Sequence, residues 1–78
     1  MDWIKQIPDD ELIYVANSVL SRLAEAVREY RTAKSHLQCN QDNEAAKVRF
    51  DEARKYFVER RDLYDALSHE LRGRGLKD

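Results

Sequence analysis

Two residues of this chain have the types and the spacing that metal ligands can have. His36 and Cys39 lie three positions apart, a spacing that two ligands of one zinc ion can use. Asp42 is the one further candidate nearby, and the second histidine, His69, follows more than thirty residues later. A metal site needs a third ligand close to the first two. We therefore expect no metal and no cofactor, and interpret the pair as polar residues at a helix end.

The acids and bases of the second half of the chain are interleaved along the sequence. Asp51 with Lys55 and Arg61 with Asp65 are spaced four apart, as in exposed helix pairs worth about 0.2–0.5 kcal/mol each. Covalent catalysis needs a base held beside a serine or cysteine, and the sequence suggests no such set. A glycine-rich phosphate loop is also missing, since both glycines occur in the last six residues. We therefore expect a solvated charged face and no enzymatic activity.

Composition narrows the class of protein further. Seventy-eight residues allow one domain, 1–78, and two glycines and one proline favour long helices. The 14 basic and 15 acidic side chains nearly cancel, whereas a nucleic-acid-binding domain usually carries a basic excess. One cysteine and no secretory or membrane-spanning segment predict a cytoplasmic protein without membrane contact.

A first long helix is predicted at about residues 9–38 from its periodicity. The acids Asp9, Asp10 and Glu11 would stand at the positive end of its dipole, and Asp9 or a neighbour can cap it. Apolar residues then follow at alternating steps of four and three, which is the heptad pattern of a coiled coil. They are Leu12, Ala16, Val19, Leu23, Ala26, Tyr30, Ala33 and Leu37.

A second long helix is predicted at about residues 44–72, after a turn at about 39–43 in which Asp42 or Asn43 can cap it. Gly73 is expected just past its end, and residues 73–78 are predicted to form a frayed tail. The same alternation of four and three gives the row Ala46, Phe50, Ala53, Phe57, Arg60, Tyr64, Leu67 and Leu71.

Two such helices joined by a short turn must fold back on each other, so the fold class is all-α, an antiparallel two-helix hairpin with coiled-coil-like packing. If facing residue numbers sum to 83, Ala26 meets Phe57 and each layer pairs small with large. This keeps the layer volume constant, as dense packing requires. A sum near 79 would instead stack Tyr30 on Phe50 and leave alanines facing each other. We therefore predict the first register.

Arg60 interrupts the apolar row of the second helix, and an unpaired charge buried there would cost several kcal/mol. Its stem can pack while its head reaches solvent, or it can pair with Glu25 or Glu59. It can also contact a partner, and a polar seam residue can specify the register of a helical bundle.

Apolar residues beyond the seam form two further stripes. Ile13, Leu20 and Val27 widen the first helix on one edge, and Tyr56 and Leu63 widen the second. The N-terminal Trp3, Ile4 and Ile7 can cover one end of the hairpin, but not the full length of a stripe. Apolar surface of this extent usually marks an interface. The five stripe residues therefore predict an interface, and the economical one is a homodimer in which two hairpins pair into a four-helix bundle.

These features favour a small non-catalytic protein–protein interaction module, of the accessory or inhibitor type. It would bind and block or bridge a protein partner, in addition to a second copy of itself. The alternative is a nucleic-acid-binding accessory protein. It would use the basic residues of the second helix, Lys47, Arg54, Arg60 and Arg61. The near-neutral charge favours a protein partner over a nucleic acid.

Overall fold

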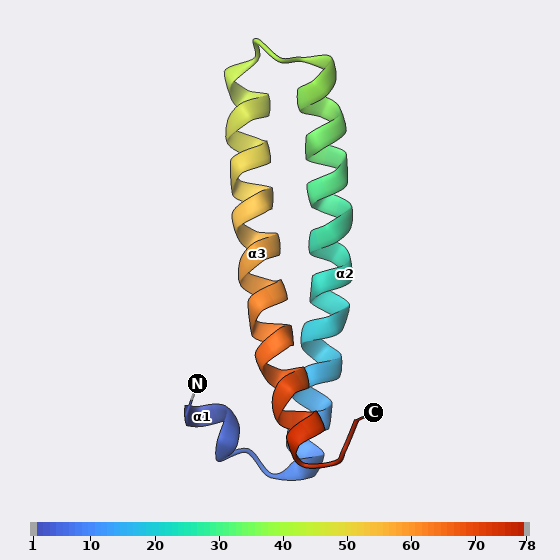
Figure 1. The fold of residues 1–78 in the computed structure, drawn as a ribbon. Coiled ribbons are helices and arrows are strands. Elements are labelled where there is room, and N and C mark those ends of the chain that lie inside the picture. Colours follow the sequence, from blue (N-terminus) through green and yellow to red (C-terminus); the bar gives the residue numbers. More distant parts are fainter. Residues whose placement is uncertain (1, 78) are drawn as a thin grey trace.

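Three helices make up the regular structure of residues 2–77, the part of the chain that the computed structural model describes. They are α1 (Asp2–Lys5), α2 (Asp9–Cys39) and α3 (Glu44–Gly73). Figure 1 shows α2 and α3 side by side and antiparallel, with both chain ends at the end away from their loop. The all-α hairpin is therefore confirmed. Met1 and Asp78, which belong to the predicted domain and tail, lie outside the described residues.

The ends of α2 follow from local capping. Pro8 occupies the N-cap position and makes no side-chain bond, so the expected cap by Asp9 or a neighbour is wrong. Asp9 instead begins the helix and, with Asp10 and Glu11, places acidic groups in its first turn. At the other end Asn40 donates from Nδ2 to the His36 carbonyl at 2.9 Å, which satisfies one of the free carbonyl groups.

A short loop leads from α2 into α3, whose first residue is Glu44. Of the two predicted caps, Asn43 is the one used: its side-chain oxygen accepts from the Ala46 amide at 3.2 Å. Such a bond satisfies one of the four free amides at a helix start. The hairpin turn and the start of α3 are thus set by the same short stretch of polar residues.

The seam between α2 and α3 contains buried alanines and stacked aromatic rings. Ala26 and Ala33 are almost fully buried, which alanine achieves only when larger side chains cover it. The Tyr30 ring lies between two rings of α3, with centroids 5.5 Å from Phe50 and 5.3 Å from Phe57. This is the place that the predicted register gives Tyr30, opposite Ala53, which separates the two phenylalanines.

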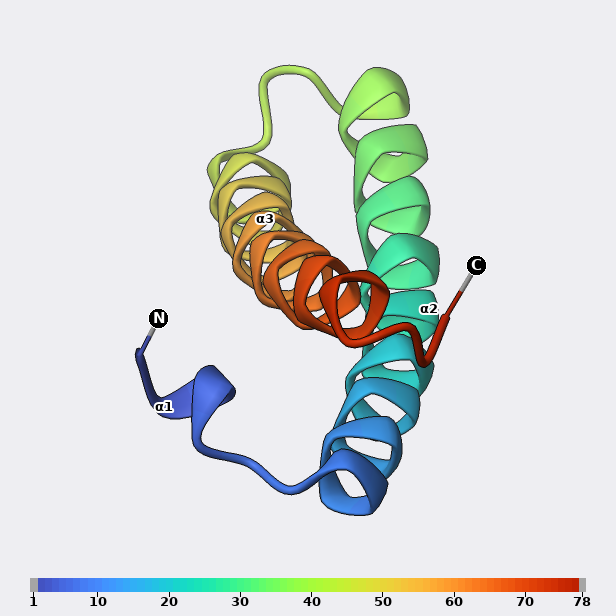
Figure 2. The same cartoon turned by 60° about the horizontal axis from the view of Figure 1, so that its bottom comes forward.

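The main cluster of buried apolar residues lies at the end of the hairpin away from the loop. Leu12 and Leu67 are fully buried there, and the short α1 covers this end by inserting Ile4. Figure 2 shows α1 beside α3, connected to α2 by an extended segment. The predicted cover from the N-terminal residues is therefore present for Ile4 and Ile7, whereas Trp3 stays about half exposed.

The C-terminal residues 74–77 are ordered against the hairpin, so the frayed tail is wrong for this range. Gly75, with φ +74°, stands just past the helix end, where Gly73 was expected. The Gly75 amide donates to the Arg72 carbonyl at 3.0 Å and the Leu76 amide to the Leu71 carbonyl at 2.9 Å. This pair of bonds is the Schellman motif, which turns the chain back along its helix.

Arg74 joins this end of the chain to the other terminus. Its guanidinium donates to the carbonyls of Ile4 at 3.1 Å, Lys5 at 3.1 Å and Ile7 at 2.6 Å. It also reaches the carboxylates of Asp9 at 3.0 Å and Glu70 at 3.3 Å. One side chain therefore binds carbonyls at the end of α1 and in the segment after it, and holds α1, α2 and α3 together. None of the helices within residues 2–77 has the length and apolar character needed to cross a bilayer.

Candidate interaction surface

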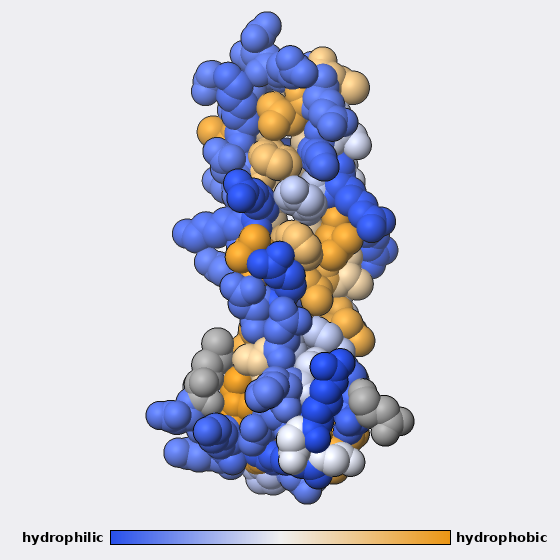
Figure 3. All heavy atoms as spheres, in the orientation of Figure 1, coloured by the Kyte–Doolittle hydropathy of each residue, from blue (hydrophilic) through white to orange (hydrophobic). Residues whose placement is uncertain are grey.

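An apolar groove of about 310 Å³ runs beside the seam near the chain ends. Its apolar walls come from α2, from the last turn of α3 and from the C-terminal segment: Ile13, Leu20, Leu71 and Leu76. Three of these stay partly open, with Ile13 40%, Leu20 44% and Leu76 36% exposed. Figure 3 shows apolar atoms gathered between the two long helices, bordered by hydrophilic ones. The groove is thus an apolar site in a mostly polar surface.

The elements around the groove explain its shape. Ile13 and Leu20 are seven residues apart on α2, so they lie on one helix face about 10.5 Å apart. The Schellman turn sends Leu76 back along α3, beside Leu71. A hydrophobic contact across these two positions commonly accompanies that motif. Helix periodicity and one glycine therefore bring three separate segments to one site.

A polar cluster borders the groove. Lys77 donates from Nζ to the Tyr64 hydroxyl at 2.8 Å and to Ser68 Oγ at 3.3 Å, and its ammonium lies 4.9 Å from the Tyr64 ring centroid. Ser68 is buried beneath this contact. The hydrogen bond from Lys77, and then that with Ser68, lowers the pKa of Tyr64 from its ordinary value of 10.0, because both favour the phenolate.

Tyr64 is expected to lose its proton at a lower pH in the folded than in the unfolded chain. The pKa is depressed by folding, so the phenolate form stabilises the fold above the unfolded pKa. This stabilisation is lost as the pH falls through the folded pKa. Tyrosinate absorbance, titrated with and without urea, measures the shift. Lys77→Met should remove most of it, and an unchanged titration in that variant would contradict the contact.

The predicted stripe residues divide into open and covered ones. Ile13 and Leu20 line the groove, while Val27 is half-buried further along α2. On α3, Tyr56 is 38% exposed, whereas Leu63 is half-buried and packs against the core cluster. The structure therefore joins Ile13 and Leu20 in one site, and Leu63 serves mainly the hairpin itself.

Arg60 lies half-buried in the seam, with its guanidinium carbon 4.8 Å from the Tyr56 ring centroid. No ion pair joins it to Glu25 or Glu59 within residues 2–77. Its buried Nε has no hydrogen-bond partner in the same part of the chain. The stem therefore packs in the seam while the cationic head rests on an aromatic face, a contact worth about 0.5–2 kcal/mol.

The predicted basic residues Lys47, Arg54 and Arg61 are all exposed on α3. Lys47 pairs with Glu44 at 3.4 Å, and Arg61 pairs with Asp62 at 3.4 Å while lying 5.7 Å from the Phe57 ring centroid. Exposed ion pairs with such nitrogen–oxygen distances contribute little to the stability of the fold. The three residues repeat every seven positions, so they form one row along the helix.

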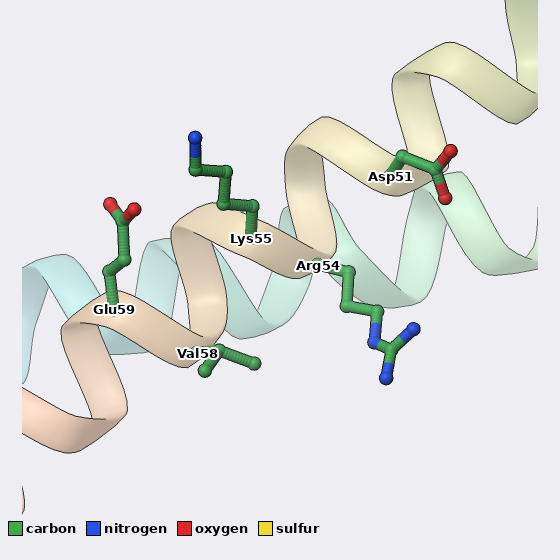
Figure 4. Close-up of a pocket in the computed structure, with 5 residues that line it drawn as sticks. All are labelled: Asp51, Arg54, Lys55, Val58 and Glu59. Atoms are coloured by element: carbon green, nitrogen blue, oxygen red, sulfur yellow. The ribbon is translucent and has the colours of Figure 1, made fainter.

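The outer surface of α3 also carries a shallow hollow. It is lined by Asp51, Arg54, Lys55, Val58 and Glu59, all from this one helix. Figure 4 shows Arg54 and Val58 pointing to one side of α3, and Lys55 and Glu59 to the other. Catalysis by acids and bases requires such groups to converge on one reacting position. The hollow therefore lacks the geometry of an acid–base site.

The loop end of the hairpin carries Cys39, which is exposed. Within residues 2–77, no group of three or more His, Cys, Asp or Glu side chains is placed to hold a metal ion. His69 stands near the other end of the hairpin, where it lines a small hollow with Ile4 and Glu70.

Sequence reasoning missed Leu76 and Lys77 as surface residues and Arg74 as an anchor. One local signal was available for the first two: Leu71 and Leu76, five apart around a glycine, match the two hydrophobic positions of a Schellman motif. Arg74 had no such signal, because all its partners except Glu70 lie 65 to 70 residues earlier. Comparison with protein-family models, with curated proteins and with solved structures finds no match for this chain.

Proposed function

We propose that this chain is a small, non-catalytic protein–protein interaction module that binds its partner through the apolar groove. The observation that carries the proposal is the exposure of Ile13, Leu20 and Leu76 in one groove, whereas the residues of the two seam rows are all buried or half-buried. Complete burial of one such side chain in an interface would contribute about 1.5–3 kcal/mol to the free energy of binding. The module would bind and block or bridge another protein, as an accessory factor or inhibitor.

A second copy of the chain is one partner that we propose. Two associated hairpins would bring four long helices together in a bundle, and a homodimer is the smallest such assembly. The short chain supports this view, because a two-helix hairpin has little core of its own and gains from further burial. We place this function in the cytoplasm, since the single exposed thiol of Cys39 suits a reducing setting.

Leu20→Glu is expected to weaken partner binding at least about tenfold, because a carboxylate in an apolar contact must lose its hydration without a partner. Ser21→Glu is the matched control, since Ser21 is exposed on the next position of α2, away from the groove. Circular dichroism should show equal helix content in both variants.

Partner binding is detected by photo-cross-linking in the source cell, with a photoreactive amino acid in place of Leu20. The same photoreactive group in place of Ser21 is the control. We expect a specific cross-linked protein from position 20 only. Equal labelling from both positions, or none from position 20 in cells that contain the folded protein, would contradict the function.

Nucleic-acid binding is the second candidate, and the exposed row Lys47, Arg54 and Arg61 is the observation that favours it. Three phosphate contacts would give a logarithmic salt slope of about −3 on a duplex. Duplex binding with this slope that is lost in Arg54→Ala would favour the second function. The apolar side chains beside the row and the net charge of −1 support a protein partner instead.

A further inference from the structure

The two sides of the hairpin seam differ in charge. In an antiparallel helix pair, one row of each helix borders the seam on each side. On the side of the groove these rows hold four bases and no acid: Lys34, Lys47, Arg54 and Arg61. The next row outward on each helix adds two bases and four acids, so this side of the hairpin holds six bases and four acids in all. We name it the basic flank, and it also carries Ile13, Leu20 and Val27.

The opposite side of the seam is acidic. Its corresponding rows hold six acids: Glu11, Glu25, Glu29, Glu52, Glu59 and Glu70. This side holds three bases, one of which is Arg60, because its guanidinium lies over the Tyr56 ring. We name it the acidic flank. It has apolar surface of its own, because Tyr56 is 38% exposed and Tyr14 and Val15 line a second hollow beside Arg22. Each flank therefore combines apolar side chains with one prevailing charge.

We propose that one copy of the chain packs its basic flank against the acidic flank of a second copy. This rests on the proposed function, for which it names the partner and the contact. A two-fold contact of the basic flank with itself would set Arg54 and Arg61 near their own copies, and like charges across an interface are destabilising. Such a contact would also cover one apolar stripe only, since Leu20 and Tyr56 lie on opposite flanks.

Spacing supports the same contact. The bases Lys47, Arg54 and Arg61 repeat every seven residues, and so do the acids Glu52 and Glu59. Both rows therefore have a period of about 10.5 Å, so that two of the bases can meet the two acids in one register. The contact joins two different surfaces, so each copy keeps one flank free, and association continues to a ring or an open chain of copies.

Sedimentation velocity of the full chain, at about 0.05 M and 0.5 M salt, tests the contact. At low salt the mean mass should rise with concentration, and high salt should weaken association because it screens the exposed charges. Two double variants reverse one flank each: Arg54→Glu with Arg61→Glu, and Glu52→Lys with Glu59→Lys. Each double variant alone should self-associate at least about tenfold more weakly than the wild type. An equal mixture of the two variants should associate again, because one then supplies an acidic flank and the other a basic flank. Circular dichroism controls for helix content.

Three results would overturn the inference. One is a wild-type chain that stays monomeric at low salt and millimolar concentration. Another is a Glu52→Lys, Glu59→Lys variant that associates as the wild type does, which would indicate a two-fold contact of the basic flank. The third is a mixture of the variants that stays monomeric. A monomer whose position 20 still cross-links to a different protein would leave the proposed function standing while this contact fails.

Discussion

Replacing Arg74 by alanine is expected to lower the free energy of unfolding by about 2–4 kcal/mol, because hydrogen bonds to a charged group contribute about 1.5–3 kcal/mol and are not additive. The side chain is 19% exposed and donates to three carbonyls and two carboxylates. Its loss leaves the carbonyls of Ile4 and Lys5 without this donor. Ile4 then loses the anchor that holds it in the core.

Two measurements follow the change. Urea unfolding gives the stability, and the fluorescence of Trp3, the single tryptophan, should shift to the red as α1 leaves α3. Arg74→Lys should lose an intermediate amount, since an ammonium cannot reproduce the planar fork of donors. Arg72→Ala is the control in the same turn and should cost less than about 1 kcal/mol. Equal stability of Arg74→Ala and wild type would show that α1 is held by Ile4 alone.

The long helices could be predicted from the sequence because their signals are local. The predicted starts at residues 9 and 44 match α2 and α3, and the predicted ends differ by one residue. Heptad spacing fixed the seam, since each row of four-and-three steps must face the other helix. The register came from side-chain volume, and the position of Tyr30 between Phe50 and Phe57 agrees with it.

The chain ends could not be predicted in the same way. Two glycines, Gly73 and Gly75, compete for the position past α3, and the choice of Gly75 places Leu76 back on Leu71. This choice depends on contacts that only the folded hairpin offers. The helical turn of α1 is shorter than an isolated helix can sustain, and it is held by Ile4 and by Arg74 from the far end of the sequence.

The candidate surface was predictable in part. Periodicity identified Ile13 and Leu20, because a helix residue one step off the seam is bordered but not covered by its neighbour. Periodicity also predicted Leu63 as an interface residue, whereas Leu63 packs against the core cluster that includes Ile4 of α1. Arg60 was recognised as an anomaly, but its contact with Tyr56 depends on a side-chain conformation that spacing does not determine.

Replacing Ala26 by leucine is expected to destabilise the hairpin by about 1–3 kcal/mol, because the added carbons must displace close-packed neighbours. Ala26 is fully buried, and the register sets it opposite Phe57, whose ring already stacks on Tyr30. Thermal unfolding should show a midpoint lower by roughly 4–8 °C for each kcal/mol. Ala24→Leu is the matched control, since Ala24 is exposed two residues away and should change stability by less than about 0.5 kcal/mol. Equal midpoints for the two variants would mean that this layer has room for a leucine, and that volume does not fix the register.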